Sequence, residues 1–532
     1  MSKAASTRIT PGLADRSHPP QDPVTSPAQD ARPDHGVPRL RSAPSPPSGA
    51  QASAPALSDA EAGALVGSLA PLLREWLPRQ RWFAGKGRPV TGFVPVAVTE
   101  LRAPGAGGPG LLHLLVRVEQ HGAAGPAPAA GRYQDCYQLL LGVRHSLPAS
   151  LAAAAIGQVE QGPLAGRTVY EGLHDPRVAD LLLERLRTPG ARGPLRFCRA
   201  APVPAGLTGR LLDAEQSNSS LVYGTGTDAI AVDGGSDAYI LKILRRVFPG
   251  PHPDLELPLA LAAEGCERVP APVGWIEAAD PSGGGRPGGG ETLALGVLQP
   301  YLRDSRDGWR LALAALTENR EFTAEARALG RATAEVHTAL AAALPTVTLG
   351  RRQTAHLAEG MSERLAAAAR AVPALLPYVP GLRTAFDALA GPAGAGRGRS
   401  AQRVHGDLHL GQALRTPDGR WSVIDFEGEP ARPLAERRRP QPPVRDVAGM
   451  LRSFDYAARQ HEPWRPDWAA RCRAAYCEGY AAASGTDPRA EPELLRAYET
   501  DKAVYEVLYE ARHRPDWLPV PMAAIRRLAA GT

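Results

Sequence analysis

The sequence predicts an α+β protein in which a strand-rich N-terminal half precedes a helical C-terminal half. Short β-type runs separated by Gly, Ala and Pro loops dominate residues 92–143 and 198–300. Apolar residues at helical spacing dominate from residue 309 onward, and one β-hairpin interrupts them within residues 403–428. Runs of strands followed by runs of helices are typical of α+β folds.

Composition limits the classes of function. The chain has 532 residues, which favours three or four structural units, and its net charge of +6 comes without a concentrated basic block. A nucleic-acid partner is therefore not required. No apolar run is long enough to span a membrane, no signal pattern opens the chain, and the five cysteines show no CxxC spacing. We expect a cytoplasmic protein with no membrane partner.

Basic residues show an unusual bias. Only four of the 61 basic residues are lysines: Lys3, Lys86, Lys242 and Lys502. Where arginine is the default, a lysine inside a predicted strand needs a reason, and Lys242 is such a residue. The longest arginine run, Arg437-Arg438-Arg439, lies in a Pro-rich loop and is predicted to be solvated.

The first part of the chain carries no evident chemistry. Residues 1–56 are rich in Pro, Ser, Ala and Gly and lack aromatic residues, so we predict a disordered tail. A helix with Asp59 as its cap should follow over residues 57–77, then strands at 92–100, 110–120 and 133–143, a strand or hairpin at 162–170 and a helix at 174–186. Gly85-Lys86-Gly87 lacks the spacing of a phosphate-binding P-loop.

Residues 198–300 read as a second strand-rich unit. Strand-like runs at 201–212 and 219–223 flank a polar turn, and the buried-type strand 238–244 contains Lys242. A helix opens at residue 253 with Glu256 in its first turn, and an apolar run covers 293–301. Helices are then expected at 309–316, 322–340, 356–369, 469–484 and 491–510. His337 is interpreted as a packed, hydrogen-bonded histidine.

The hairpin of residues 403–428 carries the clearest chemical pattern. If Asp418-Gly419 forms a two-residue loop, Gln412 and Asp425 face each other, and their oxygens are suitable ligands for one hard cation. Asp407 lies just before the hairpin, between His405 and His409. A carboxylate beside an oxygen-rich metal site is the arrangement used for phosphoryl transfer.

These motifs resemble a known family. His405-Gly406-Asp407-Leu408-His409-x-x-Gln412 and Ile424-Asp425-Phe426-Glu427 resemble the aminoglycoside-phosphotransferase branch of protein-kinase-like enzymes, and within it the maltokinases. Glutamine replaces the usual asparagine at position 412. Further similar segments are Leu77-Pro78-Arg79-Gln80-Arg81-Trp82-Phe83, Glu215-Gln216-Ser217-Asn218-Ser219, Arg445-Asp446-Val447-Ala448-Gly449-Met450 and Tyr505-Glu506-Val507-Leu508-Tyr509-Glu510-Ala511-Arg512.

The resemblance implies a bilobal protein-kinase-like fold. It places an N-terminal cap domain at residues 57–197, a β-rich N-lobe at 198–300 and a helical C-lobe with the catalytic loop at 301–532, after the tail of residues 1–56. The apolar run 293–301 would be the hinge that contacts adenine. Asp446 would either cap its helix or hold the catalytic loop through backbone N–H groups.

The resemblance also implies residue roles. Asp407 would be the catalytic base, Gln412 and Asp425 would bind Mg²⁺, and a Lys242–Glu256 ion pair would aim the lysine at the ATP phosphates. The ATP phosphates would be covered by Ser217, Asn218 and Ser219. The acceptor site would be formed by His409, Tyr505, Glu506, Tyr509 and Arg512. An ordinary polar hairpin turn, a solvent-facing Lys242 and a packing helix at 491–510 are the alternatives that the residues alone leave open.

The leading hypothesis is an ATP- and Mg²⁺-dependent kinase that phosphorylates the anomeric hydroxyl of maltose to give maltose 1-phosphate for α-glucan (glycogen) synthesis. Kinases of trehalose, glucosamine, an aminoglycoside or choline are alternatives, as is a catalytically inactive kinase-like binding module. The expected partner is a small sugar. We expect a monomer, with trehalose synthase as a candidate protein partner.

Overall fold

Three long apolar strands build the first sheet. The computed structural model describes residues 57–105, 108–120, 133–212, 217–225, 238–280, 291–391, 398–430 and 432–531, and within it this sheet has the strand order β1-β2-β3-β5-β4, with β11 also paired to β3. Helix α1 packs on it, burying Leu65, Leu69 and Leu73. The elements of this region are α1 (Asp59–Trp76), β1 (Val90–Arg102), β2 (Gly110–Gln120), β3 (Tyr133–Arg144), β4 (Ala155–Gln158), β5 (Thr168–Glu171) and β11 (Arg246–Val247).

Some sequence predictions fall outside the described residues. They are the tail of residues 1–56 and the first two positions, Glu215 and Gln216, of the predicted polar turn. The predicted cap of α1 is wrong: Ser58, not Asp59, accepts from the Glu61 N–H. The Glu61 carboxylate in turn accepts from the Ser58 backbone N–H at 2.9 Å. A capping box of this kind satisfies two backbone donors at once, which the Asp59 carboxylate inside the helix could not do.

The second sheet holds the predicted lysine strand among its inner strands. Its strand order is β6-β7-β12-β13-β10-β9-β8, and β10 pairs with β13 on one side and β9 on the other. Helix α2 buries Leu182 and Leu186 in the core of this sheet. The bounds are α2 (Pro176–Arg187), β6 (Gly190–Arg192), β7 (Leu195–Arg199), β8 (Thr208–Leu212), β9 (Ser219–Gly224), β10 (Tyr239–Ile243), α3 (Pro253–Ala263), β12 (Gly274–Ala279) and β13 (Thr292–Pro300).

The two sheets share hydrogen bonds. Strand β11 follows β10 in the chain but pairs with β3 of the first sheet. The buried Gln138 of β3 donates from Nε2 to the carbonyl of Leu244 at 2.9 Å and to that of Leu295 at 2.7 Å. The buried Arg245 bonds Glu171 at 3.0 Å and Ser219 at 2.8 Å. Both sheets and the helices that follow belong to one unit, Ser53–Thr532.

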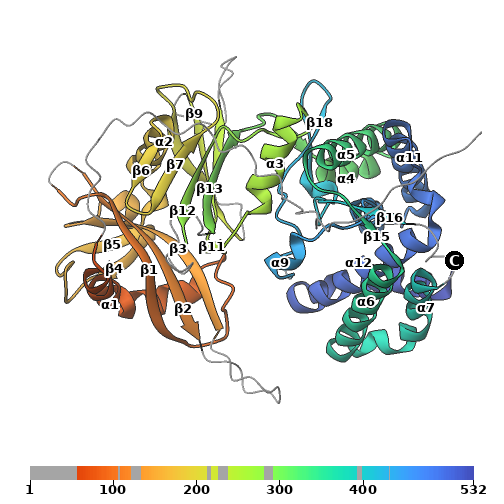
Figure 1. Ribbon diagram of the computed structural model, residues 1–532, viewed down its shortest axis with the longest axis horizontal. Coiled ribbons are helices and arrows are strands. Elements are labelled where there is room, and N and C mark those ends of the chain that lie inside the picture. The colour runs from red at the N-terminus through yellow and green to blue at the C-terminus, as the bar shows by residue number, and fades with distance from the viewer. Residues whose placement is uncertain are drawn as a thin grey trace, which may run out of the picture. The chain divides into compact units, whose positions relative to one another are not determined.

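The C-terminal part is helical, as predicted, and holds the largest core (Figure 1). Helices α5 and α11 pack closely, because a Cβ at Gly330 or Gly479 would lie 2.0 Å from the opposing backbone. The bounds are β14 (Arg306–Asp307), α4 (Gly308–Thr317), α5 (Thr323–Ala343), β15 (Val347–Leu349), α6 (Arg351–Ala371), α7 (Val379–Ala390), β16 (Arg399–Ala401), β17 (Ala413–Arg415), β18 (Trp421–Val423), α9 (Leu434–Arg437), α10 (Val444–Gln460), α11 (Pro466–Ser484), α12 (Pro492–His513) and α13 (Pro519–Ala530).

The hairpin β17–β18 differs from the predicted register by one residue. Leu414 pairs with Ser422, and the Ile424 N–H donates to the Gln412 carbonyl, so Gln412 is opposite Ile424 rather than Asp425. The reason is the turn. Gly419 has φ +86° and Asp418 does not share a positive φ, so the loop is the three-residue type that ends in a left-handed glycine.

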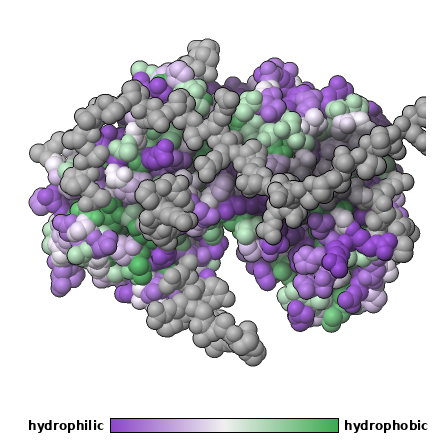
Figure 2. All heavy atoms as spheres, viewed as in Figure 1, coloured by the Kyte–Doolittle hydropathy of each residue, from purple (hydrophilic) through white to green (hydrophobic). Residues whose placement is uncertain are grey.

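The described surface is mixed. On the face shown in Figure 2, hydrophilic and hydrophobic residues alternate in small patches. None of the helices in the described part of the chain is both long and apolar enough to cross a membrane.

Candidate active site

The loop that carries Asp407, the predicted base, is held by helix α10. The Asp446 carboxylate accepts from the backbone N–H groups of His405 and Gly406, each at 2.8 Å, and from His337 Nε2 at 3.0 Å. Helix α10 begins at Val444, so Asp446 holds the loop and is not the cap of its helix. His337 also bonds the Tyr480 hydroxyl at 2.9 Å, as expected for a packed histidine.

A glycine allows α10 to approach the loop this closely. A Cβ at Gly449 would lie 2.6 Å from the carbonyl oxygen of Leu408. His405 joins the loop to the segment after β18, because its Nε2 donates to the Ile424 carbonyl at 2.9 Å. The backbone that carries Asp407 is thus fixed on two sides.

Asp407 contacts a lysine that the sequence interpretation missed. Lys502 of α12 lies 2.7 Å from Asp407 Oδ1 and 3.0 Å from Glu429 Oε1, with 15% of its side chain exposed. The signal was available, since Lys502 is one of the four lysines in an arginine-rich chain. A lysine is as unusual on the helix that carries Lys502 as on the strand that carries Lys242, so the same composition bias marks both residues.

Glu429 is the centre of a buried charge network. Besides Lys502 it accepts from Arg445 at 3.1 Å and from Arg432, which in turn bonds Asp501 at 3.0 Å. Burial alone would raise the pKa of Glu429, but these three cations hold it well below its ordinary value of 4.5. Glu429 is therefore an anion that fixes the segment after β18 against α12.

Replacing Glu429 by Gln is expected to destabilise the protein by about 3–5 kcal/mol at pH 7, because three cations lose their buried partner. A depressed pKa contributes stability that is present above the unfolded pKa of 4.5 and is lost as the pH falls through the folded pKa. The gap between the unfolding free energies of wild type and variant should therefore narrow below pH 4.5. Denaturant unfolding at several pH values measures it, with the exposed Glu493→Gln as control. A gap that is independent of pH would contradict the charged state assigned to Glu429.

Lys242 lies among three carboxylates, not beside the predicted one. Its Nζ is 2.8 Å from Asp254, 2.6 Å from Asp425 and 2.6 Å from Glu427. The predicted Lys242–Glu256 pair is wrong, because Glu256 bonds Arg403 at 2.6 Å instead. The partner on α3 is Asp254, two residues earlier.

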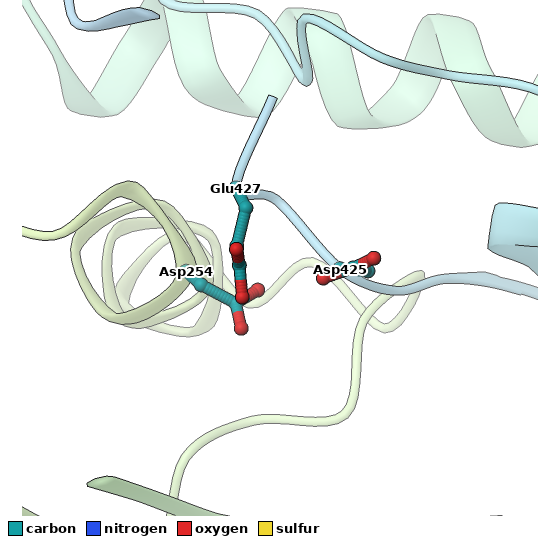
Figure 3. A group of neighbouring side chains, drawn as sticks. All are labelled: Asp254, Asp425 and Glu427. Atoms are coloured by element: carbon teal, nitrogen blue, oxygen red, sulfur yellow. The ribbon is translucent and has the colours of Figure 1, made fainter. Parts of the chain in front are cut away.

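The three carboxylates converge from two elements (Figure 3). Asp254 comes from α3, while Asp425 and Glu427 come from the segment after β18, and their oxygens lie within 4.8 Å of one another. Asp254 also accepts from the Phe426 N–H at 2.7 Å, so it fixes this segment as well as the lysine. Burial raises the pKa of Asp254 and Lys242 offsets this only in part, whereas the same ammonium outweighs the burial of Asp425 and lowers its pKa.

This arrangement fits a divalent cation. Three carboxylates share one ammonium among the described residues, so the site has more negative than positive charge, and all donors are hard oxygens. Gln412 contributes a neutral amide, which bonds Asp425 Oδ2 at 2.8 Å despite the shifted register. Asp425 has φ +66°, a left-handed conformation that is rare outside glycine and concentrates at functional sites.

Only part of the predicted phosphate turn is directed at this cluster. Asn218 donates from Nδ2 to Glu427 Oε1 at 2.5 Å, and Ser217 is exposed beside it. Ser219 is buried, and its hydroxyl accepts from Arg245 Nε rather than facing the carboxylate cluster. Of the three predicted residues, the structure brings Asn218 to the carboxylates and directs the Ser219 hydroxyl elsewhere.

Asp407 lies at the edge of a cavity of about 610 Å³. His409, Tyr505, Glu506 and Tyr509 line it, as the acceptor-site prediction requires, but Arg512 is exposed and is not among its lining residues. The other lining residues are Asp307, Trp309, Gly411, Pro430, Gly449, Ser453, Tyr456, Lys502, Glu510, Arg514 and Trp517. Arg514 contributes the guanidinium that was expected from Arg512.

His409, which lines this cavity, has a neutral ring. Burial lowers its pKa, and the nearby Asp407 opposes this only in part. Its Nδ1 accepts from the Gly411 N–H at 3.0 Å, which assigns the ring proton to Nε2. A neutral imidazole N–H is a suitable partner for a hydroxyl oxygen.

Family comparison agrees with this geometry. Residues 221–494 match the model of the phosphotransferase enzyme family (APH), and residues 76–175 match the maltokinase N-terminal cap domain. The chain belongs to this phosphotransferase family. It is therefore a kinase, and the bilobal kinase-like fold with an N-terminal cap is confirmed.

The relatives of this phosphotransferase include sugar kinases. A glucosamine kinase of Streptacidiphilus jiangxiensis is 30% identical over 367 residues, which cover 64% of this chain and 77% of the relative. A glucosamine kinase of Mycolicibacterium smegmatis is 31% identical over 340 residues, covering 60% and 79%. A solved glucosamine kinase structure has a TM-score of 0.59 at 23% identity and covers 86% of this chain and 98% of its own. The two sequence relatives support a sugar kinase that uses ATP, and the solved structure supports the fold.

Proposed function

We propose that this phosphotransferase is a maltose kinase that transfers the γ-phosphoryl group of ATP to the anomeric hydroxyl and gives maltose 1-phosphate for α-glucan synthesis. The observation that carries the proposal is the charge of the acceptor cavity. Each acidic side chain near Asp407 already has a cationic partner. A cavity of this kind favours a neutral acceptor over a cationic one.

The pairs are specific. Asp407 is paired with Lys502, and Glu510 with Arg514 at 2.6 Å. Glu506 accepts from the fully buried Arg452 at 2.6 Å. Burial also raises the pKa of Glu506, and this makes its carboxylate a weaker partner for an amine. An ammonium entering here would have to compete with guanidinium groups that are already in place.

The cavity walls supply aromatic side chains, which are the second requirement for sugar binding. Tyr505 and Tyr509 are stacked with ring centroids 6.3 Å apart, and Trp309 and Trp517 line the same cavity. Aromatic faces contact the apolar faces of sugar rings, while hydroxyls bond the charged groups between them. The cavity volume of about 610 Å³ lies within the range of small-molecule sites, roughly 300–1,000 Å³. The match of residues 76–175 to the maltokinase cap also supports maltose.

The chain's residues divide the reaction between them. Asp407 accepts the proton of the acceptor hydroxyl while the hydroxyl oxygen bonds the γ-phosphorus and the bond to the ADP oxygen breaks. Lys502 and the backbone bonds to Asp446 keep Asp407 in place. Lys242 holds its ammonium beside Asp425 and Glu427, where it would meet the phosphates of the bound nucleotide. Mg²⁺, held by Asp425, Gln412 and Glu427, would neutralise phosphate charge when bound.

Glucosamine is the second candidate, for two reasons. The relatives that share 30% and 31% identity carry that name. In addition, Asp307 lines the cavity, and within the described residues its one ion pair is with Arg310, whose side chain is 83% exposed; it also accepts from the Arg310 N–H as a helix cap. A solvated surface pair is weak, so Asp307 is the carboxylate that could bind a sugar amine.

A sugar panel with ATP consumption as readout tests the proposal. Maltose, trehalose, glucosamine, an aminoglycoside and choline should be compared, and maltose is expected to give the highest kcat/KM. The product distinguishes the candidates, because an anomeric phosphate removes the reducing end and a phosphate elsewhere leaves it.

As a control, Tyr509→Ala should raise the KM for the sugar and leave the KM for ATP unchanged. Faster turnover of glucosamine with retention of the reducing end would overturn the maltose assignment.

A further inference from the structure

The arginine run that the sequence predicts to be solvated is only partly so. Arg439 is exposed, but Arg437, the last residue of α9, and Arg438 are half-buried. Arg437 Nη1 donates to the carbonyl of Glu427 at 2.7 Å, and Arg438 Nη2 donates to the carbonyl of Pro249 at 2.8 Å. Two of the three guanidinium groups are therefore bonded to backbone carbonyls, and one of these belongs to the segment that carries Asp425 and Glu427.

Arg437 has no carboxylate of its own within the described part of the chain. Its Nη1 bonds the backbone of Glu427, and the carboxylate of that residue already contacts Lys242 at 2.6 Å and Asn218 at 2.5 Å. The Nε atom of Arg437 is buried without a hydrogen-bond partner among the described residues. A desolvated guanidinium without an ion pair is costly unless an anion binds there.

A glycine leaves room for the Arg437 side chain. Gly428 has φ +74°, and a Cβ there would lie 3.3–3.6 Å from the Cδ, Cγ and Cβ atoms of Arg437. The arginine thus runs along a position that lacks a side chain, directly after Asp425 and Glu427. Its Nη1 bonds the backbone carbonyl of Glu427, the residue whose carboxylate contacts Lys242 and Asn218.

We propose that Arg437 binds phosphate oxygens of the nucleotide, as an arginine supplied from within the chain. Its Nε and Nη donors match the oxygens of a phosphate group, which a lysine cannot match in the same way. The guanidinium stabilises the charge on the transferring group while the acceptor oxygen bonds phosphorus and the bond to ADP breaks. Arg437 neither gains nor loses a proton. The role rests on the kinase activity and on the phosphate site at Lys242, and it is independent of which sugar is the acceptor.

The test compares Arg437→Gln with Arg439→Gln, the exposed neighbour from the same run. Titrations of ATP, ADP and adenosine without sugar, together with thermal unfolding, separate phosphate binding from stability. Arg437→Gln should bind ATP at least about tenfold more weakly and adenosine as well as wild type does, with an unchanged Tm. Its kcat should fall by about tenfold or more. Arg437→Lys should restore only part of the loss, and Arg439→Gln should match wild type.

Two outcomes would overturn the proposal. One is ATP binding and kcat at wild-type levels in Arg437→Gln. The other is an equal loss for ATP, ADP and adenosine with a lowered Tm, which would show that Arg437 only supports the Glu427 carbonyl. Failure of maltose as a substrate would leave the sugar-free titrations unaffected, so the two proposals can fail separately.

Discussion

Replacing Asp407 by Asn is expected to lower kcat by about 10²–10⁴-fold, the usual contribution of a positioned general base. The amide has the same shape as the carboxylate but cannot accept the acceptor proton. Lys502 keeps Glu429 as its partner at 3.0 Å, so the buried network retains one of its two anions around the lysine. The backbone bonds from Asp446 to the loop do not involve the Asp407 side chain. The fold should therefore persist.

The measurement is kcat beside the dissociation constant of ATP, which should stay close to the wild-type value. Asp418→Asn is the matched control, because Asp418 is an exposed turn carboxylate bonded to Thr416 and Arg420. A variant of Asp407 with wild-type turnover would exclude it as the base. Loss of ATP binding would instead assign it to the nucleotide site.

Replacing Asp425 by Asn should remove the dependence of ATP binding on Mg²⁺ and lower kcat by about 10²-fold or more, since metal stabilisation of phosphoryl charge is worth several kcal/mol. Asn is preferred to Ala here for a structural reason. Residue 425 has φ +66°, a conformation that Asn tolerates and Ala does not. The variant thus removes the charge without straining the backbone.

Calorimetric titration of ATP with and without Mg²⁺ gives the result directly. The exposed Asp387→Asn on α7 serves as control, and it should retain the metal dependence of the wild type. If Asp425→Asn also retains that dependence, the cation is held by Asp254 and Glu427, and the role assigned to Asp425 and Gln412 is wrong.

Patterns of spacing predicted most of the helices and strands, while contacts between distant segments were harder to predict. Lys242 on its strand and the helix that starts at Pro253 were both expected, yet the partner on that helix is Asp254. Both Asp254 and Glu256 lie in the first turn, and only the orientation of the helix against the sheet decides between them. Periodicity within one element cannot supply that orientation.

Two further misses have the same origin. Arg512 was grouped with Tyr505 and Tyr509 by helical spacing, but α12 ends at His513, and the residue that lines the cavity is Arg514. A helical wheel does not extend past the end of the helix. The register of the hairpin depended on one φ angle at Asp418, which the sequence Asp-Gly allows in either sign.

Strand β11 follows a strand of the second sheet in the chain but pairs in the first sheet, and this arrangement affects how the protein unfolds. Strand β3 pairs with β11, just after the Lys242 strand, and the Gln138 side chain bonds the carbonyls of Leu244 and of Leu295 in β13. Opening the cap would leave these buried donors and acceptors unpaired on both sides of the break. We therefore expect the cap and the lysine-bearing sheet to unfold together in one cooperative step.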